Sequence, residues 1–288
     1  MKRLLLFALF FYGNFCFAQK STRLLQKKIK TSIVGFGGDI GIYVKNLRTG
    51  KTISINADSI FPTASIVKVP ILIGVSHKLQ SKELSLDSLF IYKDSLLYKG
   101  EDILGSFKND ETVSLKKILM LMLTTSDNTA SLWLQSIAGG GTRVNELLDS
   151  LGFSATRINS RTPGREINRA QFGWGQTTPR EAGILFESIY NKKFFSAEAS
   201  EKMLRMLGRN FWDAEALSQV PPTIEVFSKN GAVNASRSEV LLVNAPRNPY
   251  LFCIFTKNNK DQRWDNENEA WVLTRKISKL LWETFGKK

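Results

Sequence analysis

Ser65 and Lys68 are spaced so that they could act as a nucleophile and its general base. They are three residues apart in the segment Pro62–Lys68, which places both side chains on one face of a helix. A serine that begins a helix lies beside free backbone N–H groups that favour an anionic oxygen. Partial burial would lower the pKa of Lys68 toward the range of a general base. The pair predicts serine acyl transfer, although Ser-x-x-Lys also occurs in helices by chance.

The histidine, cysteine and glycine residues of the chain argue against other kinds of catalytic site. His77 is the one histidine of the chain. If Ser65 begins a helix, His77 lies about 18 Å away along the axis, so it cannot complete a Ser-His-Asp triad. Cys253 lies in an apolar segment typical of a core strand. His77 and Cys253 supply too few ligands for a zinc site. The glycine run 139–141 lacks the spacing of a phosphate-binding loop. We therefore expect no metal and no cofactor.

Two further motifs strengthen the serine–lysine hypothesis. Ser-Asp-Asn occupies residues 126–128 between helical segments, and Lys-Asn-Gly occupies residues 229–231 at the end of a predicted strand. Ser-x-x-Lys, Ser-Asp-Asn and Lys-Thr-Gly are the elements of class A β-lactamases and penicillin-binding proteins. The chain resembles class A β-lactamases across nearly all of the sequence after residue 18. The resemblance includes the Thr-Thr-Pro sequence at 177–179 that follows a long loop.

The resemblance implies catalytic roles for the residues that match the motifs. Ser65 would attack a carbonyl carbon to form an acyl-enzyme, and Lys68 would take or relay its proton. Ser126 would carry a proton to the leaving nitrogen. Lys229 would hold Ser126 and the substrate carboxylate by its positive charge.

The resemblance also implies roles in binding. Asn128 would orient Lys68 and the amide of the substrate, whereas Asp127 would be a structural, hydrogen-bonded residue. The backbone N–H groups of Ser65 and Ala232 would form the oxyanion hole, an interaction commonly worth a few kcal/mol.

The third motif departs from the family pattern. Asn230 replaces the usual threonine or serine, so an amide would meet the substrate carboxylate where a hydroxyl is expected. Arg237 could add positive charge at this place. A solvated cation on the hairpin is an equal alternative for Arg237.

The long loop departs further from the family. The family has a glutamate there that activates the water for deacylation. Counting back from residues 177–179 places Thr162 at that position. Glu166 follows four residues later, where it could reach the water if the loop is remodelled, or could be an ordinary exposed loop residue. Acylation would proceed in either case, but deacylation would depend on which alternative holds.

The elements that must position these residues have a simple order. Residues 39–48 alternate as a strand, a turn at Thr49-Gly50 leads to a second strand over 51–55, and strands return over 224–227, 238–243 and 251–256. Helical patterns predominate from Ser65 to about Leu207, with further helices over 22–31 and 267–285. We predict an α/β (α+β) fold, in which terminal helices flank an antiparallel sheet and an all-α region is inserted. The sheet layer would comprise about 22–62 and 220–288, and the helical layer about 63–215, within one domain over 19–288.

The chain begins with a sequence typical of a secretory signal. Lys2 and Arg3 precede an apolar run, and Ala18 offers a cleavage site. We expect cleavage after Ala18 and a periplasmic or secreted protein without stable membrane insertion; lipid attachment at Cys16 is a weaker alternative. Cleavage would lower the net charge from +14 to +12. The lysines are spread among acidic residues without a nucleic-acid-binding motif, so we expect no nucleic-acid partner.

Three function classes remain open from the sequence. The first is a serine β-lactamase, acting as a monomer on small β-lactam molecules. The second is a related acyl-serine enzyme, such as a DD-peptidase acting on peptidoglycan-like peptides, an esterase or a slowly deacylating penicillin-binding protein. The third is an envelope binding protein that has kept the fold and lost the activity. Thr162 and Asn230 motivate the last two.

Overall fold

The computed structural model describes residues 22–100 and 102–287 of the 288-residue chain. The predicted signal segment 1–18, its cleavage after Ala18 and the alternative at Cys16 therefore lie outside the described residues. Within the described ranges, no helix combines the length and the apolar character needed to cross a membrane.

Five strands form an antiparallel sheet in the order β2-β1-β10-β9-β8. Two of them come from the beginning of the chain, β1 (Asp39–Asn46) and β2 (Thr52–Ile55). The other three follow the helical region: β8 (Val226–Val233), β9 (Ser236–Val243) and β10 (Tyr250–Lys257). The chain therefore leaves the sheet after β2 and returns to it at β8, which is an edge strand. This arrangement confirms the predicted fold class.

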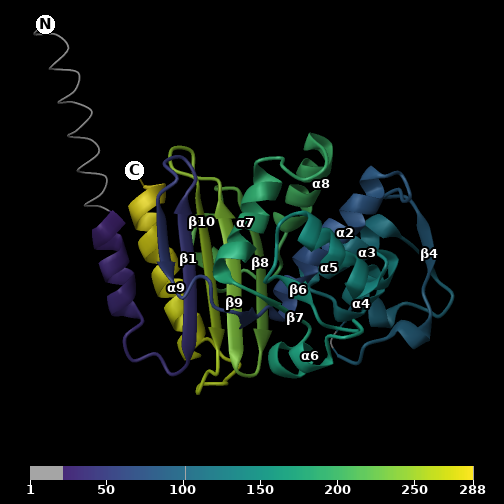
Figure 1. Ribbon diagram of the computed structural model, residues 1–288, viewed down its shortest axis with the longest axis horizontal. Helices are drawn as coiled ribbons and strands as arrows, with labels where there is room; N and C mark the ends of the chain where they lie inside the picture. The colour runs from purple at the N-terminus through teal and green to yellow at the C-terminus, as the bar shows by residue number, and fades with distance from the viewer. Residues whose placement is uncertain (1–21, 101, 288) are drawn as a thin grey trace, which may run out of the picture.

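The alternation of side chains along the strands gives the sheet two apolar faces. Ile42 pairs with Ile254, and both belong to a core formed with the helix over residues 22–32 and with α9 (Glu269–Leu281). Tyr43 pairs with Cys253 on the other face, in the core shared with the helical layer. Cys253 is buried and free, as its apolar segment predicts. Figure 1 shows the sheet between these two layers.

The inserted region consists of helices, short turns and small strand pairs. The helices are α2 (Lys68–Gln80), α3 (Leu115–Met120), α4 (Asn128–Ile137), α5 (Gly140–Ser150), α6 (Glu166–Phe172), α7 (Pro179–Tyr190) and α8 (Ala197–Leu207). Short 3₁₀ helices are η1 (Ala64–Val67), η2 (Asp94–Leu96) and η3 (Leu104–Ser106), and η4 (Leu121–Thr125) is a π-helical segment. Later in the chain follow the 3₁₀ helix η5 (Leu217–Gln219) and the π-helical segment η6 (Trp282–Gly286). The strand pairs are formed by β3 (Phe61–Pro62), β4 (Leu89–Ile91), β5 (Thr112–Ser114), β6 (Arg157–Ile158) and β7 (Gly175–Thr177).

Helix α2 runs through the middle of the helical layer. All of its residues from Lys68 to Ser76 are buried, as expected for a helix that is apolar on every side. Lys68 is the first residue of this helix, so the packing of α2 buries the amine of Lys68 in the interior. His77 lies at the other end, exposed and in ring contact with Phe195. This placement agrees with its exclusion as the base for Ser65.

The segment 154–178 has more regular structure than its composition predicts. It contains β6, α6 and β7, and β7 pairs with both β6 and β3. Thr178 caps α7 by accepting from Glu181 N. The carboxylate of Glu181 accepts hydrogen bonds from the backbone N–H groups of Ala155 and Thr156. Glu181 thus ties the start of the long segment to α7, which a local capping motif does not predict.

Candidate active site

Ser65 lies in a strained turn at the start of the central helix. It is the second residue of η1, which continues directly into α2. The preceding Ala64 has a φ of 44°, in the left-handed region that residues other than glycine rarely adopt. Strain of this kind persists where the surrounding structure enforces it, and it is frequent at active sites.

Strand β8 packs so closely on this turn that position 231 requires glycine. A Cβ atom on Gly231 would lie 2.6 Å from Thr63 O and 2.7 Å from Ser65 N. Both neighbours are backbone atoms, so neither could move aside without shifting the nucleophile. The glycine of the Lys-Asn-Gly motif therefore aligns Ser65 with β8. Ser65 and Ala232 line the same cavity, as the oxyanion-hole hypothesis requires.

Lys68 Nζ connects the nucleophile to the Ser-Asp-Asn motif. It lies 2.9 Å from Ser65 Oγ, 3.0 Å from Ser126 Oγ and 2.9 Å from Asn128 Oδ1, and it donates to Ser126 O at 2.6 Å. A neutral amine has two N–H groups and one lone pair. Ser126 O and Asn128 Oδ1 can accept the two N–H groups, which leaves the lone pair for the Ser65 hydroxyl. The contacts thus suit Lys68 as the acceptor of the Ser65 proton.

Burial lowers the pKa of Lys68 into the range that suits this proton transfer. Its side chain is 0% exposed, and desolvation lowers its pKa from 10.5 to about 7, against the opposing effect of the carboxylates of Asp102 and Asp127. The direction is the one that the sequence predicts. A base with a pKa near the working pH is efficient, because it is largely deprotonated and still basic enough to accept a proton.

We expect the rate of acylation to rise with pH through about 7. Lys68 must be neutral to accept a proton, and because its pKa is lowered to about 7 the neutral fraction grows from below that pH to above it. Between pH 5.5 and pH 8 the second-order rate constant for acylation should increase roughly 30-fold. Single-turnover kinetics with excess enzyme would measure it. A constant rate over this range, with an unchanged melting temperature, would argue that Lys68 is not the base.

The Ser-Asp-Asn motif forms a sharp turn between η4 and α4. Ser126 has a φ of 64°, a second left-handed residue at the site. Asp127 accepts from Ala130 N and Leu104 N, and burial raises its pKa. Asp127 is therefore placed as the structural residue that the resemblance implies. Asp102, which no sequence pattern indicated, accepts from the backbone N–H groups of Asn128 and Thr129 and so holds the same turn.

Lys229 supplies a second buried ammonium group beside the first. It is 0% exposed, and its Nζ donates to Asn230 O at 2.8 Å and to Asn230 Oδ1 at 3.3 Å. Burial lowers its pKa, the positive charge of Lys68 lowers it further, and Glu239 opposes both effects. Its hydrogen bonds go to Asn230 and not to Ser126, and the effect of Lys68 on its pKa indicates that the two amines lie near each other.

The structure requires one correction at the third motif, at Arg237. Asn230 pairs with Glu239 and lines a neighbouring cavity of about 690 Å³, which shares Ala232 with the cavity that contains Ser65, and its contact with the substrate stays a prediction. Arg237 was a candidate for substrate binding, but it is 1% exposed and stacks between Trp264 and Trp271, 4.3 and 4.8 Å from their ring centroids. Its guanidinium also donates to backbone carbonyl groups. Neighbouring strand residues point to opposite faces, so Arg237 faces α9 and is a structural cation.

Neither Thr162, at the position of the family's glutamate, nor Glu166, the candidate for the deacylating base, lines the cavity at Ser65. Thr162 is 6% exposed, donates to Ser160 O and packs against α5, where a Cβ atom on Gly141 would lie 1.8 Å from Thr162 Oγ1. The prediction for Glu166 needs correction. Glu166 is exposed at the start of α6, where its carboxylate accepts from Gly164 N. A carboxylate in the first turn of a helix is stabilised by the free N–H groups, which explains its outward place.

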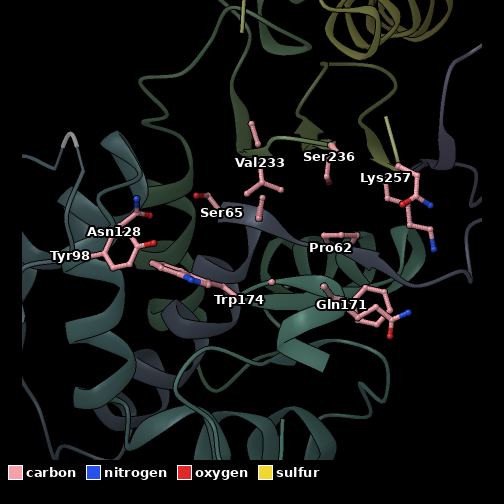
Figure 2. A pocket seen from close by; sticks show the side chains of 15 residues that line it. Pro62, Ser65, Tyr98, Asn128, Gln171, Trp174, Val233, Ser236 and Lys257 are labelled. Atoms are coloured by element: carbon pink, nitrogen blue, oxygen red, sulfur yellow. The ribbon is translucent and has the colours of Figure 1, made fainter. Parts of the chain in front are cut away.

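Ser65 opens into a cavity of about 470 Å³, the usual size of a small-molecule site. The lining residues are Pro62, Ala64, Ser65, Tyr98, Asn128, Gln171, Phe172, Gly173, Trp174, Ala232, Val233, Ala235, Ser236, Lys257 and Asn258. Among the described residues, none of those that line it is Asp or Glu. Figure 2 shows Tyr98, Asn128 and Trp174 on one side of Ser65, and Ser236 and Lys257 on the other.

One wall of this cavity is aromatic, and no sequence pattern indicated it. The rings of Tyr98 and Trp174 meet edge to face, with centroids 5.0 Å apart. Tyr98 precedes η3 and Trp174 precedes β7, so 75 intervening residues separate them and no local motif joins them. The polar composition of the long segment was the one available signal, and it indicated a functional loop without naming a residue.

Known sequences agree with the geometry. Residues 24–285 match the sequence model of the β-lactamase enzyme family. β-Lactamase VEB-1 from Pseudomonas aeruginosa is 24% identical over 299 residues, which cover 99% of this chain and 98% of that protein. β-Lactamase AER-1 from Aeromonas hydrophila is 26% identical over 249 residues, or 85% of this chain and 81% of that protein.

Known structures share the fold. PBP-A superposes with a TM-score of 0.81 at 21% identity, covering 92% of this chain and 96% of its own. A mutant of PBP-A, solved as an acyl-enzyme complex with penicillin G, gives the same TM-score and identity and covers 92% and 97%. A class A β-lactamase from Bacteroides cellulosilyticus gives 0.81 at 20% identity and covers 93% and 99%. At these identities the likeness establishes the arrangement of sheet and helices.

Proposed function

Because the chain belongs to the β-lactamase enzyme family, we propose that it is a serine hydrolase that opens β-lactam amide bonds through an acyl-enzyme on Ser65. The observation that carries the proposal is the position of Lys68 Nζ within hydrogen-bonding distance of both Ser65 Oγ and Ser126 Oγ. One amine can thus receive the proton of the nucleophile and return it through the hydroxyl that serves the leaving group.

Acylation follows from these contacts in two steps. Ser65 Oγ forms a bond to the carbonyl carbon of the β-lactam, and its proton passes to neutral Lys68. The N–H groups of Ser65 and Ala232 stabilise the anionic carbonyl oxygen. The C–N bond then breaks, and the ring nitrogen takes a proton from Ser126 Oγ, which Lys68 replenishes. The ring opens, so the leaving amine stays attached to the acyl group, and hydrolysis by water later frees Ser65.

Hydrolysis of a chromogenic cephalosporin tests this function. The wild-type protein should open the ring, and Ser65→Ala should abolish the reaction because the acyl-enzyme cannot form. Ser81→Ala is the matched control, since Ser81 is the exposed C-cap residue of the same helix α2. Equal colour change with the wild-type and Ser65→Ala proteins would exclude a role for Ser65 in the hydrolysis.

One observation favours a second candidate, a slowly deacylating acyl-serine enzyme. No described residue that lines the cavity carries a carboxylate, and Glu166 is turned outward. Such a site would acylate well and release the acyl group slowly, as a penicillin-binding protein or a DD-peptidase does with penicillin. The substrate would then include peptidoglycan-like peptides. Peptidoglycan lies outside the cytoplasmic membrane, which fits the export that residues 1–18 predict.

A further inference from the structure

The cavity at Ser65 has a polar end that the acylation chemistry does not use. This end comprises Pro62, Ser236, Lys257 and Asn258, with Gln171 from the long segment. It lies on the opposite side of Ser65 from Tyr98 and Trp174 (Figure 2). Neither Lys68 nor Lys229 is among the residues that line this cavity. The polar end therefore needs a separate account.

Lys257 and Ser236 lie beside each other on one face of the sheet. Strands β9 and β10 pair with Phe255 opposite Ser238. Beyond this pair, Thr256 Oγ1 bridges the backbone N–H and C=O of Arg237, and Lys257 and Ser236 follow at the ends of the two strands, where both line the cavity. Phe255 points to the face that packs against the helical layer, and alternation places Lys257 and Ser236 on that face as well. Strand β10 thus places the cation of Lys257, and strand β9 the hydroxyl of Ser236, at one end of the cavity.

The charge of Lys257 has no carboxylate partner among the described residues. Its Nζ donates to Ile60 O at 2.9 Å and lies 5.0 Å from the centroid of the Phe61 ring. Asp39, its cross-strand partner in β1, accepts from Asn258 Nδ2 instead. An ammonium group has three donors, and the carbonyl of Ile60 uses one. The remaining donors can serve an anionic ligand in the cavity.

Ser236 provides a second, independent sign of a ligand. Its side chain is 2% exposed, and its Oγ has no hydrogen-bond partner among the described residues. Buried hydroxyl groups nearly always have a partner, because the loss of hydration is otherwise uncompensated. Figure 2 shows this side chain directed into the cavity. An acceptor that enters the polar end would satisfy it.

We propose that Lys257 and Ser236 form a subsite for a carboxylate at the far end of the acyl group that is transferred to Ser65. The carboxylate of the β-lactam nucleus cannot be this ligand. The family resemblance assigns that group to Lys229, and Val233, the partner of Ser236, lies four residues further along β8 than Lys229. At about 3.3 Å per residue this is roughly 13 Å. The ligand is therefore a second carboxylate on an acyl chain, and the inference rests on the proposed function because it names the substrates of that same site.

A matched pair of penicillins tests the subsite. The first carries an adipoyl side chain that ends in a carboxylate, and the second carries the methyl ester of that side chain. The wild-type protein should be acylated by the acid about tenfold faster than by the ester at low salt, as second-order rate constants from intact-mass time courses. Glutaryl and pimeloyl homologues would locate the best chain length. Added salt should reduce the preference, because it screens the half-exposed ammonium group.

Variants separate the subsite from the catalytic machinery. Lys257→Met and Ser236→Ala should lose most of the preference for the acid, while acylation by the ester stays within twofold of wild type. Lys257→Arg should keep part of the preference. Lys260→Met is the matched control, since Lys260 is exposed, nearby in sequence and absent from the cavity lining. Melting temperatures would detect any loss of the packing of Lys257 on Phe61.

The possible outcomes are distinct. Equal acylation by acid and ester in the wild-type protein would overturn the subsite, and so would a preference that survives in Lys257→Met. Failure of every penicillin to acylate Ser65 would instead contradict the proposed function.

Discussion

Replacing Lys68 with methionine is expected to slow the acylation of Ser65 by about 1000-fold or more. A positioned general base commonly contributes 10²–10⁴-fold, and Lys68 Nζ is the group that contacts both Ser65 Oγ and Ser126 Oγ. Methionine has a similar length and no charge. It should keep the fold, because replacing a buried charge by an apolar side chain removes the cost of its desolvation.

The measurement is the rate of formation of the penicillin adduct on the variant, with the melting temperature recorded in parallel. Lys78→Met is the matched control. Lys78 lies in the last turn of the same helix, half-exposed and within 3.8 Å of Glu83, and its loss should leave the rate unchanged. Acylation of the Lys68→Met protein within tenfold of the wild-type rate would mean that another group accepts the proton.

The second large effect is expected in deacylation. The wild-type protein should show a burst of one turnover per enzyme molecule with a penicillin or cephalosporin, followed by a steady rate at least about 100-fold slower. Acylation has its base in Lys68, whereas the cavity offers no described carboxylate to activate the deacylating water; a missing general base costs about this factor or more. Rapid-mixing kinetics would resolve the two phases.

Glu166→Gln gives this prediction a sharp control. Glu166 is exposed and bonded to Gly164 N, so its amide analogue should release the acyl group at the wild-type rate. Accumulation of the adduct in the Glu166→Gln protein, together with rapid steady turnover in the wild-type protein, would identify Glu166 as the base and would require the long segment to rearrange.

The parts of the site that sequence could predict are those fixed by local spacing or by a complete motif. Ser65 and Lys68 are three residues apart in one helical segment, so their contact follows from helix geometry. Strand β1 follows from alternation, and the burial of Cys253 in β10 follows from its apolar neighbours. The strand limits differ from the prediction by a few residues. For example, β8 continues to Val233, so the Lys-Asn-Gly motif lies within the strand.

The parts that sequence could not predict depend on which face a side chain takes and on distant partners. Arg237 is close to the third motif along the chain, but the pleat of β9 turns it toward Trp264 and Trp271, about 30 residues later. Glu166 is exposed because it lies at the start of the short helix α6, and no sequence pattern predicted that helix. Asp102 acts on the Ser-Asp-Asn turn from 26 residues away. No periodicity or motif encodes such pairings.

An intact-mass time course with penicillin G tests the central claim most directly. We predict that the wild-type protein rapidly gains the mass of one penicillin molecule, that peptide mapping assigns the adduct to Ser65, and that the adduct is lost slowly after free penicillin is removed. Ser65→Ala should gain no mass. An adduct on another residue, an adduct that also forms on Ser65→Ala, or no adduct and no hydrolysis in the wild-type protein would contradict the account.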